Sequence, residues 1–224
     1  MSLASPIDSI ALDLFSIHMV QHMLLLVVAA PLLLLGAPVR PLLRGLPFAI
    51  RRTVVRAVAR NTAFRALVHL ARRPLVAAAL YVAGLYAWHV PALYDAAVES
   101  PPIHVLEHTW FLVTALLFWS VVIDPAPFRA TLPYAARIPF LLLVGAAQNT
   151  ILGGLLAFSD RAYYAPYATT TARYGLDPLT DQHLGGAIMW VPGDLIFLVA
   201  ASFAFFLWLQ SEEQAQRLRE SRQR

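Results

Sequence analysis

The stretch HMVQHMLLLVVAAPLLLLG, residues 18–36, decides the fold of this protein. It contains no Asp, Glu, Lys or Arg, and it is close to the ~20 apolar residues that a helix needs to cross a bilayer. Five predominantly apolar runs of similar length occur along the chain, at about residues 17–36, 74–93, 103–123, 136–158 and 183–209. We therefore expect an all-α, polytopic membrane bundle of about five transmembrane helices within residues 1–210, followed by a charged tail at 211–224.

The composition excludes most other classes of protein. Of the 224 residues, 59% are hydrophobic and 13% are charged, whereas about a quarter of the residues in a soluble domain are charged. A disordered chain would be poorer in apolar residues. There is no cysteine, so disulfides, thiolate metal ligands and cysteine nucleophiles are excluded.

The arginines predict the orientation in the membrane. Nine arginines and no acidic residue lie between Pro38 and Arg73, and such a segment is typical of the cytoplasmic side. Alternation of the spans then places the N-terminus outside and the C-terminal tail inside. Within the cytoplasmic segment 39–73, arginine and valine alternate at helical spacing, which predicts a basic amphipathic helix on the membrane surface. We expect this charge to meet lipid and not nucleic acid.

With this topology, six of the seven histidines fall near the outer membrane face. Two pairs are spaced i, i+4, so each pair lies on one face of a helix. Polar side chains in a span usually face the interior of the bundle. The sequence therefore predicts a metal site between the outer helix ends, with His18, His22, His104 and His108 as first ligands and with His89 and His183 as secondary candidates.

The histidines alone do not identify the metal, because imidazole binds zinc, copper, iron and nickel. Met19 and Met23 flank the first pair and favour copper as additional ligands, since thioethers select Cu(I); packing is the alternative role for both. Glu107 precedes His108 and could orient an imidazole. Asp194 follows a Pro-Gly pair inside the last span. There it either belongs to a functional site or bonds to backbone groups that the kink leaves without helical partners.

Two alternatives remain open at this point. Residues 104–108 read HVLEH, the H-x-x-E-H arrangement of a zinc hydrolase in which the glutamate activates water. A b-type haem protein for electron transfer would also use histidines from two spans at matching depth. No second hydrolytic motif accompanies the first, so we do not expect an enzyme.

Several stretches together resemble the multi-span CtaG family, which is named for the assembly of caa-type cytochrome c oxidase. The similarity covers nearly the whole chain in order. The matching stretches are HMVQHMLLLVVAAPLLLLGAPVRPLLRGLP (18–47), WHVPALYDAAVES (88–100), HVLEHTWFLVTALLFW (104–119), GGLLAFSDRAYYAPYA (153–168) and TDQHLGGAIMWVPGDL (180–195).

The resemblance implies a bacterial plasma-membrane chaperone that helps to mature a copper-containing oxidase. Its partners would be oxidase subunits or another copper carrier, and its metal site would face outward. The residues that match family positions, besides the histidines and Glu107, are Gln21, Asp181, Gln182 and Met189. The family often has glutamine where this chain has His183. Members usually carry about two further spans upstream, so the resemblance also implies either a shorter branch of the family or a start that is truncated at the N-terminus.

Overall fold

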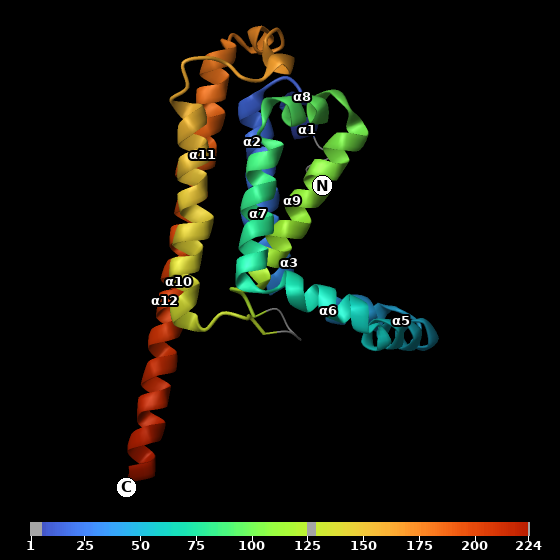
Figure 1. The fold of residues 1–224 in the computed structure, drawn as a ribbon, viewed down its shortest axis with the longest axis vertical. Helices are drawn as coiled ribbons and strands as arrows, with labels where there is room; N and C mark the ends of the chain where they lie inside the picture. The colour runs from blue at the N-terminus through green and yellow to red at the C-terminus, as the bar shows by residue number, and fades with distance from the viewer. Residues whose placement is uncertain (1–5, 125–128, 224) are drawn as a thin grey trace. The chain divides into compact units, whose positions relative to one another are not determined.

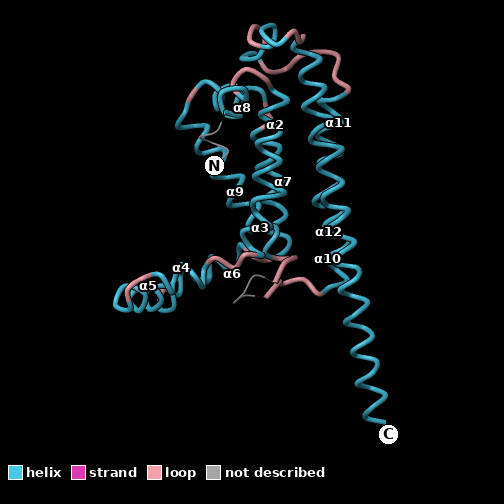
Figure 2. The backbone as a smooth tube through the Cα atoms, turned by 180° about the vertical axis from the view of Figure 1, so that it is seen from behind, coloured by secondary structure: helices cyan, strands magenta, loops and turns pink. Residues whose placement is uncertain are grey.

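The structure is a computed structural model that describes residues 6–124 and 129–223. The regular elements in these two ranges are helices and include no strand (Figure 2), which confirms the all-α prediction. The chain divides into two compact units: unit 1 is Met1–Met23 with Leu132–Arg224, and unit 2 is Leu24–Thr131. Part of the expected inner loop, residues 125–128, and the last residue of the expected tail lie outside the described residues.

Within the described residues, four helical stretches are long and apolar enough to cross a membrane. They are Phe15–Leu35, Pro101–Ser120, Tyr134–Ala157 and Pro178–Gln223. A fifth results if α6 (Thr62–Ala71) and α7 (Pro74–Trp88), which are bent by 73° at the break between them, count as one span. The protein is thus a multi-pass membrane protein with four or five spans, in agreement with the sequence prediction.

Prolines set several of the helix boundaries in unit 2. The clash between a proline ring and the preceding residue pushes that residue out of the helical conformation. Extended backbone accordingly occurs at the residue before each of Pro74, Pro91 and Pro101, and α7, α8 (Pro91–Glu99) and α9 (Pro101–Ser120) each begin at these prolines. The expected second span, 74–93, is therefore too long at its end: α7 stops at Trp88, and α8 follows as a separate helix.

Unit 2 packs α7 against α9, with α8 covering one end of both (Figure 1). The π-helical turn Leu24–Ala29 and α3 (Ala30–Leu35) also contact α9. Trp119 donates a hydrogen bond of 2.9 Å from Nε1 to the carbonyl oxygen of Leu26. Because the π turn leaves carbonyl groups out of the α-helical pattern, this indole bond helps to satisfy the backbone just before Pro31.

Unit 1 is built around α12, one helix of 46 residues from Pro178 to Gln223. The expected span 183–209 lies inside it, and the described part of the expected charged tail continues the same helix. Three consecutive elements lie along α12 (Figures 1 and 2): α10 (Tyr134–Phe140), the π-helical turn Leu141–Ala146 and α11 (Ala147–Ala157). Pro139 inside α10 cannot donate a backbone hydrogen bond, and the π turn begins two residues after it.

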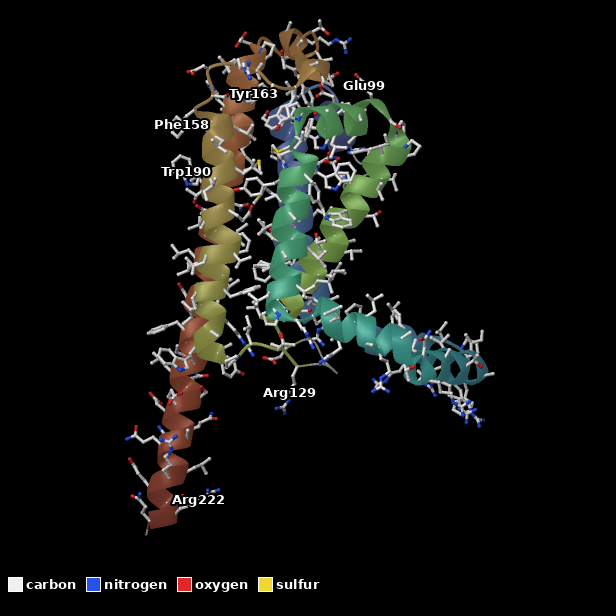
Figure 3. The ribbon with its side chains drawn as sticks, viewed as in Figure 1. Glu99, Arg129, Phe158, Tyr163, Trp190 and Arg222 are labelled. Atoms are coloured by element: carbon white, nitrogen blue, oxygen red, sulfur yellow. The ribbon has the colours of Figure 1, made fainter. Side chains whose placement is uncertain are left out.

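Glycines bring the backbones of α11 and α12 into contact. A Cβ atom on Gly153 would lie 2.7 Å from the carbonyl oxygen of Gly186, and one on Gly186 would lie 2.5 Å from the nitrogen of Ala157. Such close approach through small residues is a common way to pack helices in a membrane. Next to this contact, Phe158 and Trp190 meet edge to face with ring centroids 5.8 Å apart (Figure 3).

We predict that Gly153→Ala destabilises unit 1 and that Gly154→Ala does not. The first methyl group would overlap the backbone of α12, and overpacking of this kind costs ~1–3 kcal/mol. The second would meet no atom within 4 Å, and alanine favours a helix over glycine by ~1 kcal/mol. Thermal unfolding in detergent checks both variants. Equal melting temperatures for the two would contradict the close packing.

Candidate functional site

The first histidine pair lies on α2 (Phe15–Met23), whose N-terminus is held by Asp181 of α12. The first backbone N–H groups of a helix have no partner within it. Here the N–H of Phe15 donates to Asp181 Oδ2 at 2.7 Å and the N–H of Ser16 to Oδ1 at 3.2 Å, and the Ser16 hydroxyl also donates to Oδ1. A carboxylate at a helix N-terminus also interacts favourably with the helix dipole. Asp181 is fully buried, so this cap fixes where α2 begins against α12.

Within α2, the rings of His18 and His22 point their Nε2 atoms at one another. These atoms are 2.9 Å apart, and the ring centroids are 4.4 Å apart at an interplanar angle of 79°. Both side chains are buried, His18 completely. Two imidazole ligands of one tetrahedral ion with bonds of ~2.0 Å have nitrogens ~3.3 Å apart. A small rotation of the two rings would therefore let both Nε2 atoms bind the same ion.

Tyr167 contacts the Nδ1 side of His18. The Tyr167 hydroxyl donates to the carbonyl oxygen of Ala11 at 3.3 Å, and its oxygen lies 3.1 Å from His18 Nδ1. This contact engages Nδ1 of the ring and leaves Nε2 to face His22. A bond from the second ring nitrogen to an oxygen is the usual way in which proteins orient a metal-binding histidine.

The loop that carries Tyr167 is tied to the turn before α2. The Thr170 hydroxyl donates to the carbonyl oxygen of Asp13 at 2.7 Å, the Tyr174 hydroxyl donates to its carboxylate at 3.1 Å, and Arg173 lies 3.5 Å from the same carboxylate. The hydrogen bond to Asp13 raises the pKa of Tyr174 because it favours the protonated phenol. These contacts place Tyr167 over α2.

Gln182 and His183 hold the start of the same loop. Gln182 donates to the Ser159 hydroxyl at 2.6 Å and to the carbonyl oxygen of Arg161 at 3.1 Å, and it accepts from the N–H of Tyr163 at 2.7 Å. His183 Nε2 donates to the carbonyl oxygen of Ser159 at 2.8 Å. In this arrangement His183 stabilises the start of the loop through Nε2, and it could bind a metal only through Nδ1.

The two methionines beside the pair pack against glycines of α12. A Cβ on Gly185 would lie 3.2 Å from Met19 Cγ, and one on Gly193 would lie 2.7 Å from Met23 Cε. Met19 is fully buried. Both contacts are on the face of α2 that meets α12, which is the packing role that the sequence left open for these residues. Gln21 and Met189 are also buried.

The second histidine pair lies in the first turns of α9 in unit 2. The rings of His104 and His108 are in contact, with centroids 4.2 Å apart at an interplanar angle of 64°. His108 is buried, and Glu107 between them in sequence is completely buried. A carboxylate is rarely buried in a span unless it pairs with another polar group or serves a site. The i, i+4 spacing thus brings two imidazoles together here as it does in α2.

His89 follows α7 and has a defined tautomer. Its Nδ1 lies 2.7 Å from the carbonyl oxygen of Leu85, which can only accept, so Nδ1 carries the proton and Nε2 the lone pair. Its ring lies beside Tyr94 of α8 and Phe111 of α9, with centroids 6.2 and 6.4 Å away. His89 therefore has one nitrogen that donates to an oxygen and another that is able to act as a ligand.

A third polar group occupies the middle of the α11–α12 contact. The Thr150 hydroxyl donates to Asp194 Oδ2 across the two helices, and Gln148 donates to Asn149 within α11. The amide nitrogen of Asn149 lies against Gly193, where a Cβ would be 2.5 Å away. The bond between Thr150 and Asp194 thus joins the two helices in the middle of their contact.

Tyr167 and Ser159 are the site residues that sequence reasoning did not single out. Both lie in the stretch GGLLAFSDRAYYAPYA (153–168), but a hydroxyl in a loop of small and aromatic residues carries no metal-ligand spacing. Their roles depend on contacts with residues more than twenty positions away in the sequence, which spacing along a helix cannot predict.

Comparison with known proteins identifies the family. Residues 1–211 match the family described as cytochrome c oxidase caa3 assembly factor, Caa3_CtaG. The chain belongs to this family. The match confirms the resemblance to CtaG proteins and extends over all the helices that carry the histidines.

Curated relatives from mycobacteria are also similar. Uncharacterized proteins of Mycobacterium bovis and Mycobacterium tuberculosis are each 30% identical over 212 residues, which are 90% of this chain and 31% of the relative. One from Mycobacterium leprae is 29% identical over 216 residues, again 90% of this chain and 31% of the relative. The chain thus spans about a third of the length of these relatives. No solved structure matches it.

We predict that Asp181→Asn weakens the start of α2. The carboxamide keeps one oxygen and loses the negative charge, so it cannot accept the Phe15 and Ser16 bonds as the carboxylate does. The loss of such a cap costs ~0.5–2 kcal/mol. Hydrogen exchange should become faster at residues 15–18. Asp160→Asn, the same change at an exposed loop position, is the control, and equal exchange in both variants would refute the role of the cap.

Proposed function

We propose that this protein helps to assemble a copper-containing cytochrome c oxidase by binding copper through its histidine pairs and passing it to the oxidase. Membership of an oxidase assembly family supports the assembly role. The observation that supports the copper hypothesis is the geometry of His18 and His22, whose Nε2 atoms are 2.9 Å apart while Nδ1 of His18 contacts the Tyr167 hydroxyl. The proposed site faces the outer side of a bacterial plasma membrane.

The residues divide into ligands and groups that orient them. His18 and His22 are the proposed ligands in unit 1, and His104, His108 and His89 are those in unit 2. Tyr167 orients His18, Leu85 orients His89, and Asp181 positions the whole of α2. Glu107 is buried beside His108 in the sequence, and a cation bound there would favour its carboxylate form. A chain that receives and releases copper forms and breaks only coordination bonds, so no general acid, general base or nucleophile is required.

The donor set suits a carrier. Imidazole is a common copper ligand, and a neutral imidazole binds the ion without adding a negative charge. The absence of cysteine is consistent with a site on an oxidising side of the membrane, where thiols would be converted to disulfides. Oxidase subunits or another copper carrier would take the ion from this site.

We predict that His18→Ala with His22→Ala abolishes copper binding by the purified protein, and that His104→Ala with His108→Ala lowers it. Metal analysis after loading with Cu(I) measures the bound copper per chain, and circular dichroism verifies that each variant keeps its helices. His69→Ala, at an exposed position of α6, is the control and should bind as the unaltered protein does. Unchanged copper content in the first double variant would rule out the assignment.

The same preparation separates the alternatives. If either double variant loses all the copper, the two pairs serve one ion; if each loses half, they serve two. A haem protein would show a Soret band in its absorption spectrum. The HVLEH arrangement at 104–108 as a hydrolase would instead yield bound zinc and a hydrolytic activity that Glu107→Gln removes.

We also predict that Tyr167→Phe weakens copper binding without removing the ligands. Loss of the hydroxyl frees His18 to turn and to exchange its proton between the two nitrogens, and loss of such an orienting bond typically lowers metal affinity by ~10–100-fold. Copper titration against a competing chelator measures the change. Tyr163→Phe, in the same loop and partly exposed, should leave the affinity unchanged. If both variants bind equally well, Tyr167 has no orienting role.

A further inference from the structure

Two helices of unit 2 carry basic and apolar side chains that are exposed among the residues that the structure describes. These helices, α5 (Phe48–Arg60) and α6 (Thr62–Ala71), extend away from the end of α7 (Figure 1). The side chain of Asn61 caps α6 by accepting from the N–H of Phe64 at 2.9 Å, so the two helices meet at a defined turn. We name α5 and α6 together the basic arm.

Three of the four arginines of α5 lie on the face opposite its apolar residues, and the fourth, Arg51, lies over the ring of Phe48 at 5.4 Å from the ring centroid. Positions 52, 56 and 60 are spaced i, i+4, i+8 and carry exposed arginines. Positions 50, 54 and 58 have the same spacing about half a turn away and carry Ile50, Val54 and Val58, which are 51, 41 and 47% exposed. A helix with one basic and one apolar face lies in a membrane interface, with the apolar side in the acyl chains and the charges at the headgroups.

The angle between α6 and α7 places the basic arm near the membrane surface. The two helices are bent by 73° because Arg73, before Pro74, has an extended backbone. If α7 crosses the bilayer along its normal, α6 runs close to the membrane plane. The side chains of Arg65, His69 and Arg72 are spaced i, i+4, i+7 on α6, so they follow one side of it and could not all remain in hydrocarbon if α6 continued the span.

A hollow on the basic arm is lined by both apolar and basic side chains. Its volume is about 650 Å³, and it is lined by apolar Val58, Phe64 and Val68 and by basic Arg65, His69 and Arg72. Arg72 is held at its edge by bonds to the carbonyl oxygens of Ser120 and Arg129 at 3.1 and 2.7 Å. Apolar and cationic side chains that lie next to one another can bind a phospholipid, because the acyl chains and the phosphate group of a phospholipid also lie close together.

We propose that the basic arm is an interfacial docking surface for anionic phospholipid of the cytoplasmic leaflet. The apolar face of α5 enters the acyl region, Arg52, Arg56 and Arg60 contact lipid phosphates, and the hollow takes one headgroup beside Arg65 and His69. The arm then sets the level at which α7 enters the membrane. This surface is separate from the histidine pairs and does not depend on copper binding.

The test compares hydrogen exchange of the full chain in nanodiscs of phosphatidylcholine and of phosphatidylcholine mixed with phosphatidylglycerol. We expect the amides of residues 51–60 to exchange more slowly in the anionic discs. The free energy gained per arginine near an anionic surface corresponds to about a fivefold effect, and high salt should reduce it. Native mass spectrometry of the same sample should show retained phosphatidylglycerol.

The variant R52Q/R56Q/R60Q should lose the extra protection and the retained lipid. The control R217Q/R219Q/R222Q removes the same charge from the exposed end of α12 and should leave both unchanged. Equal exchange in the two lipids, or equal protection in both triple variants, would overturn the proposal. So would protection that appears only when oxidase subunits are added, since the arm would then be a protein-docking surface.

Discussion

The burial of one carboxylate at the start of a helix organises unit 1. Asp181 lies in the first turn of α12 and accepts the first backbone N–H groups of α2, so the first turn of the histidine-bearing helix is bound to the longest helix of the unit. A buried helix end cannot leave its N–H groups without partners at low cost. The cap therefore settles the start of α2 and, through the helix geometry, the positions of His18 and His22 three and seven residues further on.

Small residues complete this arrangement. Gly185 gives room for the ring of Phe15, where a Cβ would lie 2.3 Å from the ring, and Phe15 in turn stacks on Tyr164 and meets Tyr167 at its edge. The same side chain thus links the cap, the α2–α12 contact and the loop. The contact between the Tyr167 hydroxyl and Nδ1 of His18 depends on all of these interactions.

Much of this could be predicted from the sequence because it follows from local rules. Continuous apolar runs gave the spans, and the i, i+4 spacing gave two histidine pairs whose rings do meet. One difference from the prediction has a local cause as well. The second run, 74–93, reads as one span by hydropathy, yet the extended residue before Pro91 separates α7 from α8.

The sequence by itself determined that the chain is a helical membrane protein, which helix faces carry imidazoles, and to which family it belongs, since length, periodicity and motif order are properties of the chain. Only the tertiary structure decided what the surrounding groups do. It placed Asp181 at the end of α2, gave His183 to the loop, turned Met19 and Met23 toward glycines and brought Tyr167 to His18. These roles arise from contacts between residues up to 166 positions apart, and no spacing along one helix encodes them.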